Sequence, residues 1–221
     1  MGIGSAIENI GEERALEHLK RYYISGLYTG AHFESLVAGE NVPGRFTAAD
    51  LYAVSTLSVT VPVKAGIEIL GSGATVFNGL LEEIPTTRIS ELSKDDFTEH
   101  LGPGSPAIRL WDLLRRNTTG QARWGIGPTT ASKIMARKRP HLIPIQDSVV
   151  DVVIERGKGS GWKLWWEALS GDDALEQMAD RLRREIDRPH LSTLRVFDVV
   201  LWMEGKSRGV VSTPDDEVTA K

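Results

Sequence analysis

Apolar residues recur every three to four positions along most of the chain, which is the spacing of one face of an α-helix. In residues 12–27 these are Leu16, Leu19, Tyr23 and Leu27. The same spacing predicts helices at 47–57, 63–70, 74–84, 95–101, 107–117, 148–156, 162–169, 172–187 and 191–204. The first of these is predicted to start with a capping box, because Asp50 stands three residues after Thr47. No paired segments alternate apolar and polar residues as strands would, and Pro62 interrupts the β-branched run at 59–63. The sequence therefore predicts an all-α fold.

The length of 221 residues suits one large domain or two small lobes that each bury a core. Apolar residues make up 41% of the chain and charged residues 25%, which is ordinary for a globular protein. We expect a two-lobed helical fold. Its predicted parts are 1–46, a helix and loop packed on the C-terminal lobe; 47–146, a helical lobe; 147–205, the C-terminal lobe; and 206–221, a flexible tail.

Several classes of protein and site are disfavoured by what the sequence lacks. There are no cysteines, which excludes disulfides, iron–sulfur clusters and thiolate zinc sites. The five histidines are scattered, so neither a metal site nor a cofactor is predicted. No apolar run approaches twenty residues and the N-terminal residues do not form a secretory signal, so we expect a cytoplasmic, monomeric protein without a membrane partner.

The most informative segment is the run Gly125-Ile126-Gly127-Pro128, which a helical pattern follows directly. Glycine tolerates unusual backbone dihedrals and lets the backbone approach a ligand, and proline suits the first turn of a helix. The N–H groups at such a helix start are suited to bind a phosphate. The segment therefore predicts a phosphate-binding turn.

Charge around this turn supports a nucleic-acid partner. Residues 113–146 contain no acid although the whole chain carries a net charge of −4. The basic residues in that window are Arg115, Arg116, Arg123, Lys133, Arg137, Lys138 and Arg139. Such a window predicts contact with phosphates that is independent of base sequence. The alternative is an ordinary turn followed by a solvated basic helix face.

Residues 125–133 and 142–147 resemble the helix-hairpin-helix–Gly/Pro–Asp superfamily of base-excising DNA glycosylases. The resemblance covers about 124–150, and it implies a helix-hairpin-helix at about 110–138. The family's aspartate matches Asp147, eighteen residues after Thr129. The sequence departs from the family motif at two places. Arg123-Trp124 replaces the usual Leu-Pro, and Pro128 replaces a basic residue. Most of the chain also resembles an uncharacterised, largely actinobacterial family of unknown function.

The resemblance implies duplex DNA as partner and Asp147 as a catalytic carboxylate that stabilises charge on the sugar while the base leaves. Thr129 stands where strand-cleaving members carry lysine, which implies a monofunctional enzyme because a Schiff base requires an amine. The DNA-binding residues would be Trp124, Gly125, Ile126, Gly127, Thr129, Thr130, Lys133, Arg137, Lys138 and Arg139. Two alternatives are a non-catalytic helix-hairpin-helix module and a protein whose basic patch binds an acidic protein.

Several of these residues also have a purely structural interpretation. Asp147 precedes a predicted helix and could simply cap it. Asp151, one turn later, could pair with it or be a solvated acid. Asp198 is expected to form an internal ion pair with Arg195. Trp124 is expected to pack under the turn, and the stripe Trp162, Trp165, Trp166 and Leu169 is expected to form core.

Overall fold

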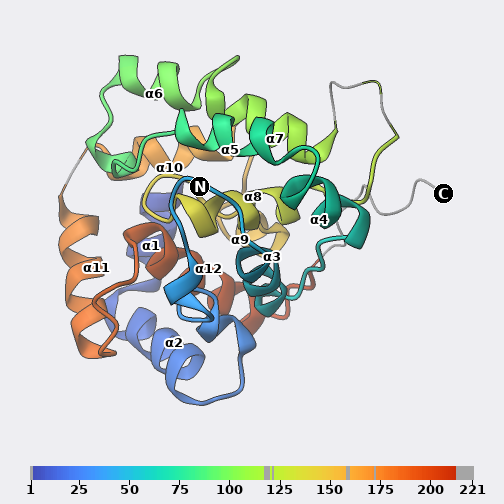
Figure 1. Cartoon of the computed structure of the whole chain (residues 1–221). Coiled ribbons are helices and arrows are strands. Elements are labelled where there is room, and N and C mark those ends of the chain that lie inside the picture. The colour runs from blue at the N-terminus through green and yellow to red at the C-terminus, as the bar shows by residue number, and fades with distance from the viewer. Residues whose placement is uncertain (1, 117–119, 121, 158–159, 172, 213–221) are drawn as a thin grey trace. The chain divides into compact units, whose positions relative to one another are not determined.

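The computed structural model describes residues 2–116, 120, 122–157, 160–171 and 173–212. Across these ranges the secondary structure is helical and contains no strand (Figure 1). The predicted all-α class is therefore confirmed. None of the described helices is long and apolar enough to cross a membrane. The chain divides into two compact units, each assembled from segments that are distant in sequence.

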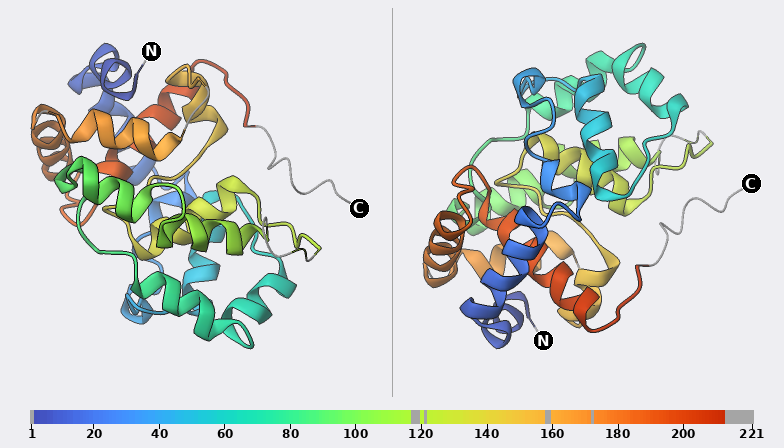
Figure 2. Two further views of the ribbon diagram at one scale, coloured as in Figure 1. Left: turned by 90° about the horizontal axis from the view of Figure 1, so that it is seen from above. Right: turned by 90° about the horizontal axis from the view of Figure 1, so that it is seen from below.

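Unit 1 combines Met1–Ala31, Thr87–Leu92 and Pro140–Thr213. Its helical elements are α1 (Ile3–Ile10), α2 (Glu12–Ile24), η4 (Ile89–Glu91), α9 (Ser148–Val153), α10 (Gly161–Leu169), α11 (Ala174–Glu185) and α12 (Thr193–Ser207), and a short turn η1 (Thr29–His32) begins in it. Helix α12 packs against α1, α2, α9 and α11. The N-terminal helices, drawn in blue, thus lie beside the red C-terminal helix (Figures 1 and 2).

Helix α12 is buried along most of its length, so the polar residues on it need internal partners. Arg195 forms a 2.7 Å ion pair with Asp198 and also donates hydrogen bonds to the Tyr22 hydroxyl and the Gly30 carbonyl. The predicted internal pair is confirmed, and it connects α12 to the N-terminal segment of the same unit.

The short segment Thr87–Leu92 belongs to unit 1 through hydrogen bonds to residues far along the chain. The Ile89 N–H donates to the His141 carbonyl at 2.9 Å, and the Trp166 indole N–H donates to the Leu92 carbonyl at 2.9 Å. On the same helix as Trp166, the side chains of Trp162, Trp165 and Leu169 are buried. The predicted core role of this stripe is confirmed for Trp162, Trp165 and Leu169, whereas Trp166 is partly exposed.

Unit 2 combines His32–Thr86 and Ser93–Arg139. Its elements are η2 (Ala38–Glu40), α3 (Ala48–Val54), η3 (Ser55–Leu57), α4 (Val63–Leu70), α5 (Ala74–Glu82), α6 (Lys94–Leu101), α7 (Pro106–Arg115) and α8 (Pro128–Lys138). Helix α8 packs against α3 and α7, and α7 packs against α5 and α6. Local signals fix the helix starts, since Thr47 and Asp50 form the predicted capping box of α3.

Helix ends differ from the predicted ones where a local bond competes with the helix. Helix α2 ends at Ile24 and not at Leu27, because the Ser25 hydroxyl donates to the Arg21 carbonyl and Gly26 adopts a φ of +72°. Helix α7 ends at Arg115, and Asn117, which was predicted to be helical, lies outside the described residues. Helix α1 was not predicted.

The units also have other bounds than the predicted lobes. Residues 32–46 belong to unit 2, whereas Thr87–Leu92 and residues 140–146 belong to unit 1. Of the predicted tail at 206–221, residues 206 and 207 continue α12, and 213–221 lie outside the described residues.

The close packing of α9 on α12 depends on Gly205. A Cβ atom there would lie 2.4 Å from Cγ1 of Val149 and 2.9 Å from Cγ2 of Val153. We expect Gly205→Ala to lower the unfolding free energy by roughly 1–3 kcal/mol, because the extra methyl group forces the two helices apart. The melting temperature measured by circular dichroism tests this.

Gly79 supplies the matched control, since it also lies inside a helix but its added Cβ would have no neighbour within 4 Å. Gly79→Ala should raise the melting temperature slightly, because alanine is the better helix former by about 1 kcal/mol. A Gly205→Ala protein as stable as Gly79→Ala would contradict the packing described.

Candidate functional site

The predicted phosphate-binding turn, residues 125–128, lies in unit 2 between α7 and the first turn of α8. Gly125 has a φ of +86°, which favours glycine, and a Cβ there would lie 3.3 Å from Cγ of Pro62. Gly127 is the N-cap of α8 with φ −88° and ψ −178°, and Pro128 is the first helical residue. The turn and the proline-initiated helix thus have the predicted local geometry. Thr129 is partly exposed at its start, whereas Thr130 is buried.

Trp124, directly before this turn, is packed inside unit 2. Its indole N–H donates to the Leu114 carbonyl at 2.6 Å, and its ring stacks on Phe77. The Arg116 guanidinium carbon lies 3.7 Å from the centre of the indole ring. Trp124 and Ile126 are both buried, so the packing interpretation of Trp124 is confirmed. Neither side chain is presented to a ligand in this conformation.

The basic run at the end of α8 is buried rather than solvated. Arg137 donates to the carbonyls of Phe33, Glu34 and Leu36, and its Nε lies 3.4 Å from an Asp50 carboxylate oxygen. These bonds fix the loop that leads into α3. Carbonyl oxygens therefore occupy the fork of donors that would otherwise suit a phosphate.

Asp50 is the carboxylate that pairs with Arg137 and Lys138 of this run. Its Oδ2 accepts from Lys138 Nζ at 2.8 Å and from the Thr47 amide at 2.9 Å, and Asp50 and Lys138 are both buried. Burial lowers the pKa of Lys138 below its usual range, and the Asp50 carboxylate opposes that change. Lys138 also donates to the Asn41 side chain at 2.6 Å.

Arg139 and Lys133 are anchored in the same way. Arg139 donates to the carbonyls of Leu81, Ile84 and Pro43, and burial lowers its pKa. Lys133 Nζ donates to the Leu57 carbonyl at 3.0 Å. Both side chains are buried.

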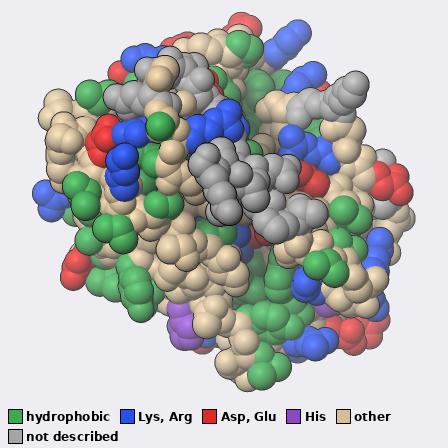
Figure 3. All heavy atoms as spheres, turned by 90° about the vertical axis from the view of Figure 1, so that its right-hand side faces the viewer, with side chains coloured by type: hydrophobic (Ala, Val, Ile, Leu, Met, Phe, Trp, Pro, Cys, Tyr) green, Lys and Arg blue, Asp and Glu red, His purple; other side chains and the backbone are tan. Residues whose placement is uncertain are grey.

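The expectation that this window displays its charges to solvent is therefore corrected for Lys133, Arg137, Lys138 and Arg139. Arg116 is buried as well and pairs with Glu68 of α4, whereas Arg123 is exposed. On the face drawn in Figure 3, positive and negative side chains alternate with apolar ones and no broad basic field is visible. Helices α3 and α4 supply the acids that residues 113–146 lack.

Asp50 and Glu68 were not singled out as partners of this window by the sequence. The only signal at Asp50 was its place three residues after Thr47, which indicates a helix cap. The Asp50 carboxylate therefore both caps α3 and pairs with cations of α8. Its Oδ2 accepts from Thr47 and Lys138, and its Oδ1 lies 3.4 Å from Arg137 Nε.

Asp147 lies in unit 1, at the N-cap of α9. Its Oδ1 accepts a 2.9 Å hydrogen bond from the Val149 amide, and the residue is partly exposed. The capping interpretation is confirmed, and the carboxylate remains within reach of solvent. The predicted catalytic residue and the predicted DNA-binding turn thus belong to different units.

Asp151 follows one turn after Asp147 and pairs with Arg156 at 2.9 Å. Burial raises the pKa of Asp151, Arg156 opposes this, and the charge of Asp147 adds to the rise. The two carboxylates therefore interact electrostatically. Among the described residues, no group of three or more histidine, aspartate or glutamate side chains is arranged to hold a metal ion.

The buried charges around Asp50 make its substitution costly. We expect Asp50→Asn to lower the unfolding free energy by roughly 3–5 kcal/mol, because Arg137 and Lys138 would stay buried without a counter-charge. Urea denaturation tests this. Asp180→Asn is the control, since Asp180 pairs with Arg183 but its side chain is 54% exposed, and a loss within about 1 kcal/mol is expected. Equal losses of unfolding free energy in Asp50→Asn and Asp180→Asn would show that the buried contacts of Asp50 stabilise the fold no more than an exposed ion pair does.

Comparison with known proteins places most of the chain in one family. Residues 15–205 match a family described as a family of unknown function (DUF6308). No curated protein matches the chain, and no solved structure matches it. The match spans nearly all of both units apart from the two ends, and the chain belongs to this family of unknown function.

Proposed function

We propose that this protein binds duplex DNA through the turn at Gly125–Pro128 and hydrolyses the N-glycosidic bond of a damaged or modified base, with Asp147 as the catalytic carboxylate. The observation that carries the proposal is the partly exposed carboxylate of Asp147, held at the start of α9 by the Val149 amide. It follows the glycine turn at the spacing of the helix-hairpin-helix–Gly/Pro–Asp glycosylases.

The chemistry requires a fixed negative charge beside the sugar. As the base departs, positive charge develops on the deoxyribose ring, and a carboxylate oriented in advance stabilises it without reorganising. The Val149 hydrogen bond uses one lone pair of Oδ1 and fixes the orientation of Asp147. The bond between the base and the anomeric carbon breaks with its electron pair going to the base, and water adds its oxygen to that carbon. The proton that the water gives up ends on the departing base, so the products are the free base and an abasic site.

Thr129 bears on the type of product. It occupies the position where strand-cleaving members of the resembled superfamily carry a lysine, and a hydroxyl group forms no Schiff base. The proposal is therefore a monofunctional hydrolase that leaves the DNA strand intact.

Binding of the DNA backbone is assigned to the turn itself rather than to the basic run. Gly125 adopts a left-handed conformation, Gly127 caps α8 in an extended conformation, and the helix dipole favours negative charge at this end. Arg123, just before the turn, is exposed. Lys133, Arg137, Lys138 and Arg139 hold the hairpin helix in place from inside unit 2.

A second candidate is a non-catalytic DNA-binding module that keeps the same fold. The observation in its favour is that Asp147 caps α9, a structural task sufficient to explain an aspartate at this position. The two candidates differ in whether the charge of Asp147 is needed or only its hydrogen-bond acceptor.

Asp147→Asn separates the charge from the cap. Asparagine is as good an N-cap as aspartate, so the melting temperature should change little. Base release from a panel of damaged and modified duplexes should fall at least a hundredfold, since the charge that stabilises the sugar is lost. Abasic sites are measured by alkaline cleavage of labelled duplexes.

Asp173→Asn is the control, because Asp173 is also an exposed aspartate at a helix start in unit 1. It should leave base release unchanged. Equal yields of abasic sites from the native and Asp147→Asn proteins would favour the binding module.

The phosphate-binding turn is tested at Gly127. Gly127 is buried, and its φ and ψ suit an aspartate or asparagine N-cap, so the two substitutions add side chains of the same size at the same helix start. Gly127→Asp should weaken duplex binding at least tenfold at moderate salt, because its carboxylate repels the phosphate. Gly127→Asn, of the same size but uncharged, should weaken it much less. Fluorescence anisotropy of a labelled duplex measures both.

A second pair of variants tests duplex binding by the turn without a substitution at Gly127. Arg123→Glu should weaken duplex binding, whereas Lys94→Glu, also exposed and in unit 2, should not. If all four proteins bind as the native chain does, the turn is not the DNA contact.

A further inference from the structure

One surface of unit 1 carries aromatic and aliphatic side chains that the proposed function does not use. Tyr28 stacks on Tyr22 with ring centres 5.1 Å apart, and the Trp202 ring lies edge-on to both. Tyr28 and Trp202 are partly exposed. Ile24 and Leu27 beside them are 62% and 73% exposed. Contiguous exposed apolar groups of this kind mark a binding surface.

Helices α2 and α12 of this unit also carry exposed cations. Glu204 of α12 is buried and accepts from Arg14 at 2.6 Å, His18 at 2.7 Å and Arg208 at 2.9 Å, and these partners lower its pKa to about 2. The single carboxylate is thus fully engaged, while the side chains of Arg14 and Arg208 are each 49% exposed.

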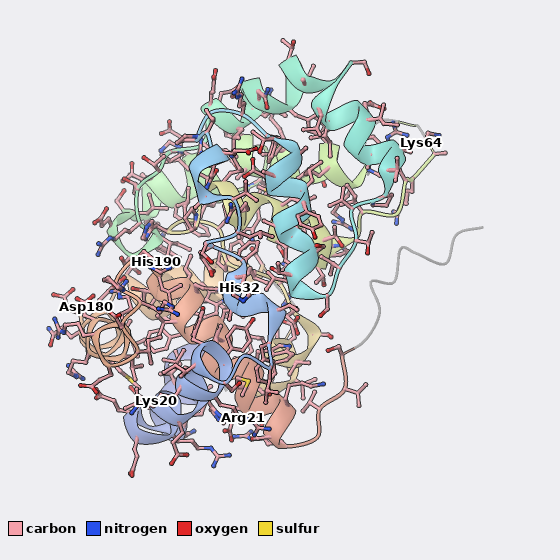
Figure 4. All side chains as sticks on the ribbon, turned by 60° about the horizontal axis from the view of Figure 1, so that its bottom comes forward. Lys20, Arg21, His32, Lys64, Asp180 and His190 are labelled. Atoms are coloured by element: carbon pink, nitrogen blue, oxygen red, sulfur yellow. The ribbon has the colours of Figure 1, made fainter. Side chains whose placement is uncertain are left out.

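Lys206 borders one of the aromatic rings, and Arg21 is a further exposed cation of α2. Lys206 is exposed and its Nζ lies 5.8 Å from the centre of the Trp202 ring. Arg21 is exposed one helical turn after His18, on the side of α2 that carries Arg14, and it projects from α2 together with Lys20 (Figure 4). The exposed acids of α2 are Glu12, Glu13 and Glu17.

We propose that this surface, the α2–α12 face formed by Arg14, Arg21, Tyr28, Trp202, Lys206 and Arg208, binds single-stranded DNA. The cations would contact phosphates and the partly exposed aromatic rings would stack on bases. The inference rests on the proposed function in taking DNA as the nucleic acid.

Two observations favour a nucleic-acid strand over an acidic protein. A cation beside a partly exposed aromatic ring combines the two contacts that single strands use, a charge for the backbone and a flat surface for a base. In addition, α12 packs directly on α9, the helix that Asp147 caps, through Gly205. An enzyme that acts on a base outside the duplex must hold unpaired DNA.

The test measures binding of a fluorescein-labelled, mixed-sequence single strand of sixteen nucleotides by anisotropy at several salt concentrations. The double variant Arg21→Glu/Lys206→Glu should bind at least tenfold more weakly at 50 mM salt. The slope of log affinity against log salt should also fall by about 1.4, since each lost phosphate contact contributes ~0.7. Lys163→Glu, an exposed site on α10 of the same unit, should behave like the native chain.

The aromatic part is tested separately at Trp202. Trp202→Ala should weaken binding of the single strand roughly tenfold, while Trp202→Phe, which keeps a stacking ring, should retain most of the affinity. Melting temperatures of all variants establish that they are folded, and the charge variants decide the matter if Trp202→Ala unfolds.

Each outcome supports or overturns the inference. Native affinity in the folded double variant would overturn it. So would displacement of the labelled strand by polyglutamate as effectively as by unlabelled oligonucleotide, which would indicate an acidic protein partner. Duplex binding that depends on Gly127 and base release that depends on Asp147 can each fail without affecting these results, so failure of the proposed function is distinguishable.

Discussion

The buried carboxylate of Asp50 and the cations that meet it hold unit 2 together. A charge removed from water is stable only beside an opposite charge with its remaining hydrogen bonds satisfied. Asp50 meets this condition through Lys138, Arg137 and Thr47. Through Arg137 and Arg139, the same end of α8 also satisfies carbonyls in the loops before α3 and after α5. The position of the glycine turn at the other end of α8 depends on this anchoring.

Unit 1 also contains buried charges that are paired with opposite charges of the same unit. The Arg195–Asp198 pair joins α12 to Tyr22 and the Gly30 carbonyl, and Glu204 gathers Arg14, His18 and Arg208. Directly after Glu204, Gly205 allows α9 to pack closely on α12. Asp147 is therefore presented by a short helix that rests on the best-packed element of its unit. A rigid support of this kind suits a carboxylate whose task requires a fixed orientation.

The proposed binding and catalytic functions are assigned to different units. The glycine turn in unit 2, which is proposed to bind phosphate without regard to base sequence, offers backbone geometry and a helix dipole. Unit 1 holds Asp147, and also the aromatic and cationic α2–α12 face proposed for unpaired DNA. Recognition of the backbone and chemistry on the sugar are thus assigned to separate structural supports.

The sequence by itself determined the helices and their starts, because these depend on nearby residues. The apolar spacing located most helices, Thr47 and Asp50 identified a cap, and Gly125 identified a turn with positive φ. Only the tertiary structure decided where the charges lie. Residues 113–146 contain no acid, yet Asp50 and Glu68 arrive from α3 and α4 and neutralise basic side chains of that window. Partners of a buried charge are set by helix packing between segments distant in sequence, and no local pattern records them.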